Sequence, residues 1–283
     1  MPMQNEVRID PSVARILLFE EVYPARAAQE QAEKSKLNAF GTLARLNPLN
    51  RPKADTVLLS KWELRYEPFW HVQARREVDF SRNATYQLPV TQPHARSLRI
   101  AGQEHPVASP HGGKAHVELA VCESCQRRID ATVHQDGMKR EIKPVLLQRY
   151  IEKYRATGLE QIDREGALEP LLPSQAALQI ALSRLASEAI DASQIHQDVV
   201  TVEALHLYYR PVFAFEYAWS TAGKIGVVEV DGLTGEVAES GQWFRDKLGG
   251  MMSRDLLVDI GADVVSMAIP GGSIAVKVIN RLV

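Results

Sequence analysis

The chain has 283 residues, of which 45% are hydrophobic and 24% charged, and its net charge at pH 7 is −2; such a chain can bury a core without disulfide or metal staples, and its charge argues against a general binder of polyanions. The segment Met1–Pro24 lacks the basic start and apolar run of a signal peptide, two cysteines do not make a secreted disulfide framework, and Asp259 and Asp263 interrupt the longest apolar stretch. We therefore expect a soluble, cytoplasmic protein without a spanning helix, although contact with a membrane surface stays open.

Residues 1–50 are predicted to form an N-terminal helical segment. Asp10 can cap a helix that begins at Pro11, because apolar residues follow at helical spacing as far as Val22. Residues 25–46 are rich in helix formers and precede a turn-rich linker, which indicates a second helix.

Residues 51–140 are predicted to form a first β lobe. Over Thr56–Val90 the hydrophobic period changes to 2, and the parity that includes Trp62 and Phe80 is apolar and rich in aromatic residues. Because strand side chains alternate between faces, this pattern predicts one long strand with one buried face. Pro68 cannot donate to a ladder, so we expect the strand to be kinked there or to lie at a sheet edge.

The rest of this lobe is predicted to contain shorter elements. Residues 83–90 and 96–107 are typical of strands, and residues 113–137 predict a hairpin with Cys122 and Cys125 at its turn.

Three further segments complete the predicted chain. A helical insertion spans 141–197, with helices over 144–158 and 172–190, and a second β lobe spans 198–241. The tail, 242–283, is predicted to contain an amphipathic helix, whose apolar stripe includes Leu256, Leu257, Ile260 and Val264. The stripe suits core packing, docking on a partner, or contact with a membrane surface.

A short motif occurs twice in the chain. Tyr66–Val72 has the sequence YEPFWHV, and 143 residues later Tyr209–Phe215 has the sequence YRPVFAF. The proline lies on the apolar parity in both copies, which chance pairs of alternating strands need not share. We interpret the repeat as a duplication. The predicted fold is therefore α+β, with two related antiparallel β lobes joined by a helical insertion and flanked by terminal helices.

The repeated strands resemble those of a group of bacterial proteins, many of which carry an N-terminal TFIIB-like zinc ribbon. In that group a Y-x-P-F-W strand is followed by helices, an L-x-P-V-W strand and a closing N-G-x-T-G-x-V-x-G turn. RYEPFWHVQA resembles the first strand, and YYRPVFAFEYAW followed by VDGLTGEVAESG resembles the second strand and its turn. Phe213 replaces a tryptophan here, and the zinc ribbon is absent. The resemblance implies a fold rather than an activity.

The pair Cys122 and Cys125 is the strongest candidate for metal or redox chemistry. A redox pair needs a helix N-terminus, whereas a hairpin turn suits half of a structural zinc site, which needs two more ligands. We consider His105 or His111, His71 or His94, or the same turn of a second subunit as sources of these ligands. Two reduced cysteines without metal remain an alternative, so zinc is a candidate cofactor only.

Other patterns indicate binding rather than catalysis. The basic pairs Arg75-Arg76, Arg127-Arg128 and Lys139-Arg140 could contact phosphates, but outer faces of antiparallel strands carry such charges too. Phe69 is an apolar residue on the polar parity of its strand, and Val212 is its counterpart in the second copy. We therefore predict a partner surface at Phe69 and Val212, extended by the tail residues named above.

The predicted function is that of a non-enzymatic adaptor or assembly subunit. It would present β surfaces and terminal helices to a protein partner or to a second copy. The alternative is a zinc-binding module, either an enzyme or a nucleic-acid binder, that Cys122 and Cys125 organise.

Overall fold

The computed structural model describes residues 5–41, 44, 50–108, 114–238 and 274–278. The described chain is mixed α and β and consists mostly of sheet. Its strands are β1 (Asn5–Ile9), β2 (Ala14–Phe19), β3 (Val57–Pro89), β4 (Ser97–Ile100), β5 (Gln103–Pro106), β6 (His116–Asp136), β7 (Ala156–Leu159), β8 (Gln194–Trp219), β9 (Lys224–Asp231), β10 (Val237–Ala238) and β11 (Ile274–Val278). Its helices are α1 (Ala25–Ser35), α3 (Pro144–Lys153) and α4 (Ser174–Ala186), with 3-10 turns η1 (Pro11–Val13) and η2 (Asn38–Phe40).

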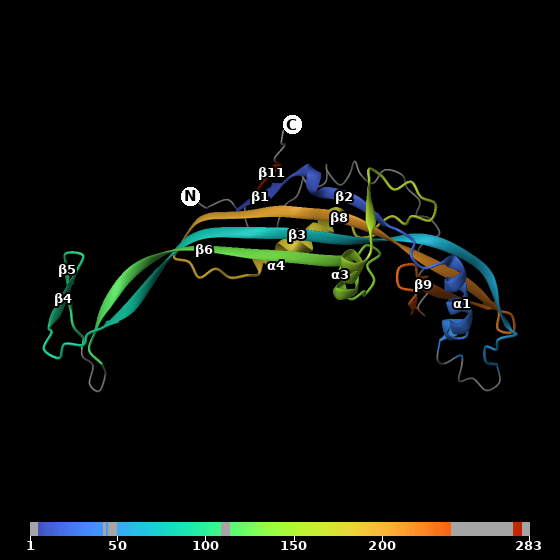
Figure 1. Cartoon of the computed structure of the whole chain (residues 1–283), viewed down its shortest axis with the longest axis horizontal. Helices are drawn as coiled ribbons and strands as arrows, with labels where there is room; N and C mark the ends of the chain where they lie inside the picture. Colours follow the sequence, from blue (N-terminus) through green and yellow to red (C-terminus); the bar gives the residue numbers. More distant parts are fainter. Residues whose placement is uncertain (1–4, 42–43, 45–49, 109–113, 239–273, 279–283) are drawn as a thin grey trace.

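The long strands β3 and β8 pair with each other and form the centre of one nine-stranded sheet (Figure 1). β6 pairs antiparallel with β3, and β9 pairs antiparallel with β8. β1 and β2 both pair parallel with β8, one after the other along the edge of β8 that faces away from β3. The two predicted lobes therefore share one sheet, and this sheet is not purely antiparallel.

Beyond Ser81 the sheet narrows to a two-stranded arm. The pairing of β3 with β8 ends at Ser81, while β3 and β6 stay paired as far as Pro89 and His116. The small β4–β5 hairpin lies at the far end of this arm, well away from the helices (Figure 1). The predicted separate strand at 83–90 is thus the outer part of β3.

The predicted helix after Asp10 is wrong. Pro11 begins only the short turn η1, and the chain then enters β2. Ile16 and Leu18 are buried on one face of the sheet, where β2 pairs with both β8 and β7. A short apolar run fits both the helical period of 3.6 and the strand period of 2. Pairing of β2 with two neighbouring strands stabilises the strand conformation here. The helices predicted near α1, α3 and α4 are confirmed, whereas the predicted tail helix lies outside the described residues.

Helices cover both faces of the central sheet. α4 packs against Tyr66 and Trp70, on the face that the sequence predicted to be buried. α3 packs against Phe69 and Tyr208 on the opposite face. Because successive strand residues point to opposite faces, the segment from Tyr66 to Val72 is buried on both sides rather than on one.

The repeated motifs pair with each other. Glu67 lies directly opposite Arg210, and the flanking positions pair tyrosine with proline in both directions, Tyr66 with Pro211 and Pro68 with Tyr209. We call β3 with β6 and α4 the β3 side, and β8 with β9, α1 and β2 the β8 side.

Each side has an equivalent turn, at Gly137 and at Gly232, and we call these two the glycine turns. The Gly137 N–H donates to the Pro68 carbonyl and the Gly232 N–H donates to the Pro211 carbonyl, both at 2.9 Å. These glycines follow Asp136 and Asp231, which end β6 and β9. A Cβ on either glycine would lie within 2.8 Å of its proline's carbonyl oxygen, so both positions require glycine.

Candidate binding edge and the charge network beside it

The two sides differ in how their outer strand edges are closed. On the β8 side, β2 pairs in parallel with Leu205–Tyr209. Because the two motifs lie 143 residues apart, the corresponding stretch of β3 is 62–66. Here the described residues supply a single bridge, between Tyr66 and Ala167, with hydrogen bonds from Tyr66 N–H to Gly166 and from Leu168 N–H to Tyr66. We call Lys61–Leu64 the open edge, because the described residues place no strand beside it.

Side chains of the open edge are apolar where their counterparts are core residues. Trp62 is 51% exposed, whereas Leu205 at the corresponding position is 1% exposed. Leu64 is half-buried, whereas Leu207 is fully buried. Trp62 stacks on Phe215 with a centroid separation of 6.3 Å, which leaves its outer part free. An exposed tryptophan beside an unpaired strand edge is a typical contact point for a partner.

A pocket of about 700 Å³ lies along the open edge. Its walls are β3 from Lys61 to Tyr66 and the loop from Arg164 to Leu168. Gly166 has a φ of +84° and packs against the Leu64 carbonyl. A backbone turned in this way cannot continue as a strand beside β3, so the loop leaves the edge and the pocket opens.

Charged side chains of the open edge pair with one another and with the adjacent Arg65. Lys61 Nζ lies 3.1 Å from Glu63 Oε2, and Arg65 also pairs with Glu63. Arg65 reaches Glu229 of β9 at 3.4 Å. The edge is thereby connected to a set of charges in the sheet interior.

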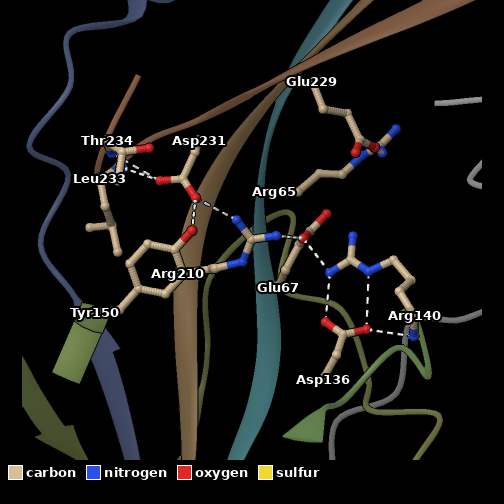
Figure 2. Close-up of polar contacts among 10 residues, drawn as sticks. All are labelled: Arg65, Glu67, Asp136, Arg140, Tyr150, Arg210, Glu229, Asp231, Leu233 and Thr234. Carbon is tan, nitrogen blue, oxygen red and sulfur yellow. Dashed lines mark hydrogen bonds and ion pairs between the residues drawn. The ribbon is translucent and has the colours of Figure 1, made fainter. Parts of the chain in front are cut away.

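This interior set is a buried network of ion pairs across β3, β8 and the ends of β6 and β9 (Figure 2). Glu67 is fully buried, and its Oε2 accepts from the guanidinium groups of Arg210 and Arg140, both at 2.7 Å. Arg140 also contacts Asp136 at 2.8 Å, and Arg210 contacts Asp231 at 2.6 Å. Asp136 and Asp231 thus each connect the glycine turn that follows them to the central strands β3 and β8.

Further contacts fix the second turn and α3. The Tyr150 hydroxyl of α3 donates to Asp231 Oδ2 at 2.5 Å. The other oxygen of Asp231 accepts from the backbone N–H groups of Leu233 and Thr234, at 2.8 and 3.0 Å. Figure 2 shows these contacts converging on one carboxylate. The network therefore joins α3 and both glycine turns to the central strand pair.

The network shifts the acidities of its members in opposite directions. Burial alone would raise the pKa of Glu67, but the guanidinium groups of Arg210 and Arg140 outweigh it and lower that pKa. Burial, and then the charge of Glu67, raise the pKa of Glu229 to about 7. Glu229 therefore takes up a proton before Glu67 does as the pH falls.

The predicted partner surface at Phe69 and Val212 is wrong. Phe69 is 0% exposed and Val212 is 2% exposed. Phe69 stacks against both Phe19 and Tyr208, at centroid separations of 6.1 and 5.3 Å. The polar parity of β3 is predicted to face solvent, but α3 covers it at Phe69. The tail residues Leu256, Leu257, Ile260 and Val264 lie outside the described residues.

The predicted hairpin turn at Cys122 and Cys125 is also wrong. Both lie within the continuous strand β6, opposite Asn83 and Phe80 of β3. Residues three apart in a strand point to opposite faces, so one ion cannot readily take both sulfurs. Both thiols are free.

The other predicted ligands do not gather around the cysteines. His105 lies on β5, His71 contacts His134 instead, and His111 lies outside the described residues. Within the described parts of the chain, no group of three or more histidine, cysteine, aspartate or glutamate side chains is placed to hold a metal ion. Zinc binding by the cysteines stays a prediction that this strand geometry does not favour.

The arginine pairs are engaged in ion pairs. Arg75 contacts Asp130 and Glu203 at 2.8 and 2.7 Å, and Arg76 contacts Asp198 at 2.8 Å. Arg127 and Arg128 pair in the same way with Glu188 and Asp130. Guanidinium groups held by carboxylates are poor contacts for phosphates, because the carboxylates would have to be displaced.

No family model, curated protein or solved structure matches this chain. The resemblance to the zinc-ribbon-associated proteins therefore stays a prediction. Among the described helices, none has the length and hydropathy to cross a bilayer.

Sequence reasoning missed the open edge and the network. The alternation over 62–66 predicted a strand but not which of its edges is paired. The signal for the network was present, since Glu67 and Arg210 occupy the same position of the two repeats with opposite charges.

Proposed function

We propose that this protein is a non-enzymatic adaptor that binds a protein partner by accepting an extended segment of the partner at the open edge of β3. The observation that carries this proposal is the exposure of Trp62 at a position whose counterpart, Leu205, is buried in the strand contacts of β2. An incoming strand would occupy the place that β2 occupies on the β8 side.

Strand addition is a common mode of peptide recognition, since backbone hydrogen bonds supply affinity and side-chain pockets supply specificity. The pocket beside Trp62 and Leu64 offers room for such side chains. The bulge between Leu59 and Lys61 limits the edge at one end, and the bridge at Tyr66 limits it at the other. The expected contact is therefore short, about four residues.

We also propose that the two sides descend from one duplicated unit. The motif spacing, the paired glycine turns and the helices that begin after Pro24 and Pro173 support this proposal. The open edge is then one place where the two copies diverged.

The test places a photo-crosslinking amino acid at position 62 in the full chain, in cells. We expect a crosslinked partner, or a crosslinked second copy, from position 62 and not from position 86. Tyr86 is a matched control, because it is 54% exposed on the same strand but lies on the arm.

A second variant separates strand addition from other contacts at Trp62. Tyr66 turns its backbone N–H and C=O outward, so Leu64, two residues earlier, does the same. Leu64→Pro removes the outward N–H, whereas Leu64→Ala keeps it. We expect the crosslink to be lost in Leu64→Pro and kept in Leu64→Ala. Equal crosslinking in both variants would rule out strand addition.

A further inference from the structure

A row of three imidazoles crosses the sheet at a place separate from the open edge. His134 of β6, His71 of β3 and His206 of β8 are direct cross-strand neighbours. Directly opposed side chains share one face of a sheet, so the three rings lie in a line. His71 and His134 are 8% and 7% exposed.

The rings are close enough to sense each other's charge. His71 Nδ1 lies 2.9 Å from His134 Nε2, so one of these nitrogens donates a hydrogen bond and the other accepts it. The ring centroids of His71 and His134 are 4.9 Å apart, and those of His71 and His206 are 5.7 Å apart. The buried Nδ1 atom of His206 has no hydrogen-bond partner among the described residues.

Charged groups of the neighbouring elements lie around this row. Glu152 of α3 favours the protonated form of His134, whereas Arg15, directly opposite His206 on β2, disfavours protonation there. Arg184 of α4 lines the same pocket as His71 and donates to the Thr132 carbonyl. Farther along the strands, Arg75 of β3 is balanced by Asp130 of β6 and Glu203 of β8. Tyr208 of β8 packs uncharged against two of the rings.

A pocket of about 530 Å³ connects the row to solvent between α3 and α4. Its lining includes His71, His134, Gln148, Glu152, Ile180 and Arg184. Protons can therefore reach the row without unfolding of the chain.

We propose that this row is a proton-operated switch, in which protonation of a second imidazole separates α3 from the sheet and widens the pocket. One proton can be shared, because a protonated ring still donates to a neutral neighbour. A second proton on the His71–His134 pair leaves two N–H donors facing each other at the hydrogen-bond distance. Their repulsion is little screened in this buried place, and movement of α3 would let water in.

The acidities of the three rings agree with this geometry. Burial, followed by the neighbouring His134 and His206, lowers the pKa of His71 to about 4. Burial also lowers the pKa values of His134 and His206. The unfolded chain therefore binds more protons than the folded chain between about pH 6.5 and 4. The stability that the neutral row contributes is complete above this window and is lost as the pH falls through it.

The first test compares equilibrium unfolding of the wild-type chain, His71→Gln and His196→Gln at pH 7.5 and pH 5, with EDTA present throughout. His196 lies exposed on β8 and is the matched control. Between these pH values we expect the unfolding constant of the wild type and the control to rise about 30-fold more than that of His71→Gln. An equal rise in all three chains would overturn the proposal.

The second test needs no variant. Hydrogen exchange, corrected for intrinsic rates, compares α3 with α4 in the wild-type chain at the same two pH values. We expect at least a tenfold rise in the opening constant of α3 at pH 5 and a smaller change in α4. Equal opening of both helices, or a response of α3 that EDTA abolishes and so assigns to a metal ion, would contradict the proposal.

Discussion

The β3 side and the β8 side share a glycine turn, a helix that begins after proline and a motif strand, but in the described parts of the chain a strand closes the outer edge at 205–209 and none closes it at the corresponding residues 62–66. β2 closes it with Ile16 and Leu18, which are both buried. The loop that approaches the β3 edge begins with Asp163-Arg164-Glu165-Gly166, in which Gly166 has a positive φ, and meets β3 only afterwards, at the bridge between Ala167 and Tyr66. Four residues without an apolar side chain cannot replace β2. The sequence of one short connecting segment therefore decides whether a described strand covers this part of the sheet edge.

The centre of the molecule shows a second difference between the sides. The same repeat position carries Glu67 on one side and Arg210 on the other, and these residues face each other. Two copies with identical residues there would bring like charges together in a buried place. Opposite charges allow the two strands to pair.

Loss of the central carboxylate is the largest effect that we expect. Glu67→Ala leaves the guanidinium groups of Arg210 and Arg140 without their shared partner, which should cost about 3–5 kcal/mol of unfolding free energy. Urea unfolding measures this loss. Glu63→Ala is the control, since Glu63 is partly exposed, and it should cost less than about 1 kcal/mol. Similar losses for both variants would mean that the network does not hold the strands together.

Truncation of corresponding edge residues tests whether the two edges differ in their contribution to stability. Leu205→Ala removes a side chain that is buried in the core cluster of β8, β2 and α4 and should cost about 2–5 kcal/mol. Trp62→Ala removes a half-exposed side chain from the open edge and should cost less than about 1.5 kcal/mol in the isolated chain. Urea midpoints of the two variants give the contrast, and a larger loss for Trp62→Ala would place Trp62 in the core.

Much of this contrast could not be read from the sequence. The repeat at Tyr66 and Tyr209 correctly indicated long strands with an apolar face toward α4. The same alternation assigned Phe69 to solvent, because sequence spacing does not reveal that α3 covers the second face. Residues 14–19 fit a helix as well as a strand, and only the pairing with β7 and β8 decides between them. The open edge is likewise defined by strand pairing, so the sequence alone could not reveal it.

The glycine turns should respond alike on both sides. Gly137→Ala and Gly232→Ala each bring a Cβ to within 2.8 Å of a proline carbonyl oxygen, and each should cost about 2 kcal/mol. Gly158→Ala is a suitable control, because a Cβ there meets nothing within 4 Å. Thermal unfolding measures all three variants. A harmless substitution at only one of the two turns would contradict their equivalence.

Glu229 should give an effect of the same size as the glycine turns, and one that depends on pH. Because its folded-state pKa is raised to about 7, the folded chain holds a proton that the unfolded chain releases above about pH 4.5. Its contribution to stability is therefore present at low pH and falls as the pH rises through 7. Between pH 5.5 and 7.5 the wild type should lose about 2 kcal/mol relative to Glu229→Gln, measured by urea unfolding. A difference that stays constant with pH would show that Glu229 is ionised throughout.

Amide hydrogen exchange in the complex tests the central claim most directly. Once the crosslink at position 62 has identified the partner, exchange of residues 61–65 is compared in the free chain and with the uncrosslinked partner in excess. Strand addition at the open edge predicts at least tenfold slower exchange at Leu64 on binding, with Tyr86 on the arm unchanged. Unchanged exchange at Leu64 in a saturated complex would contradict the account, because the edge would then still be open.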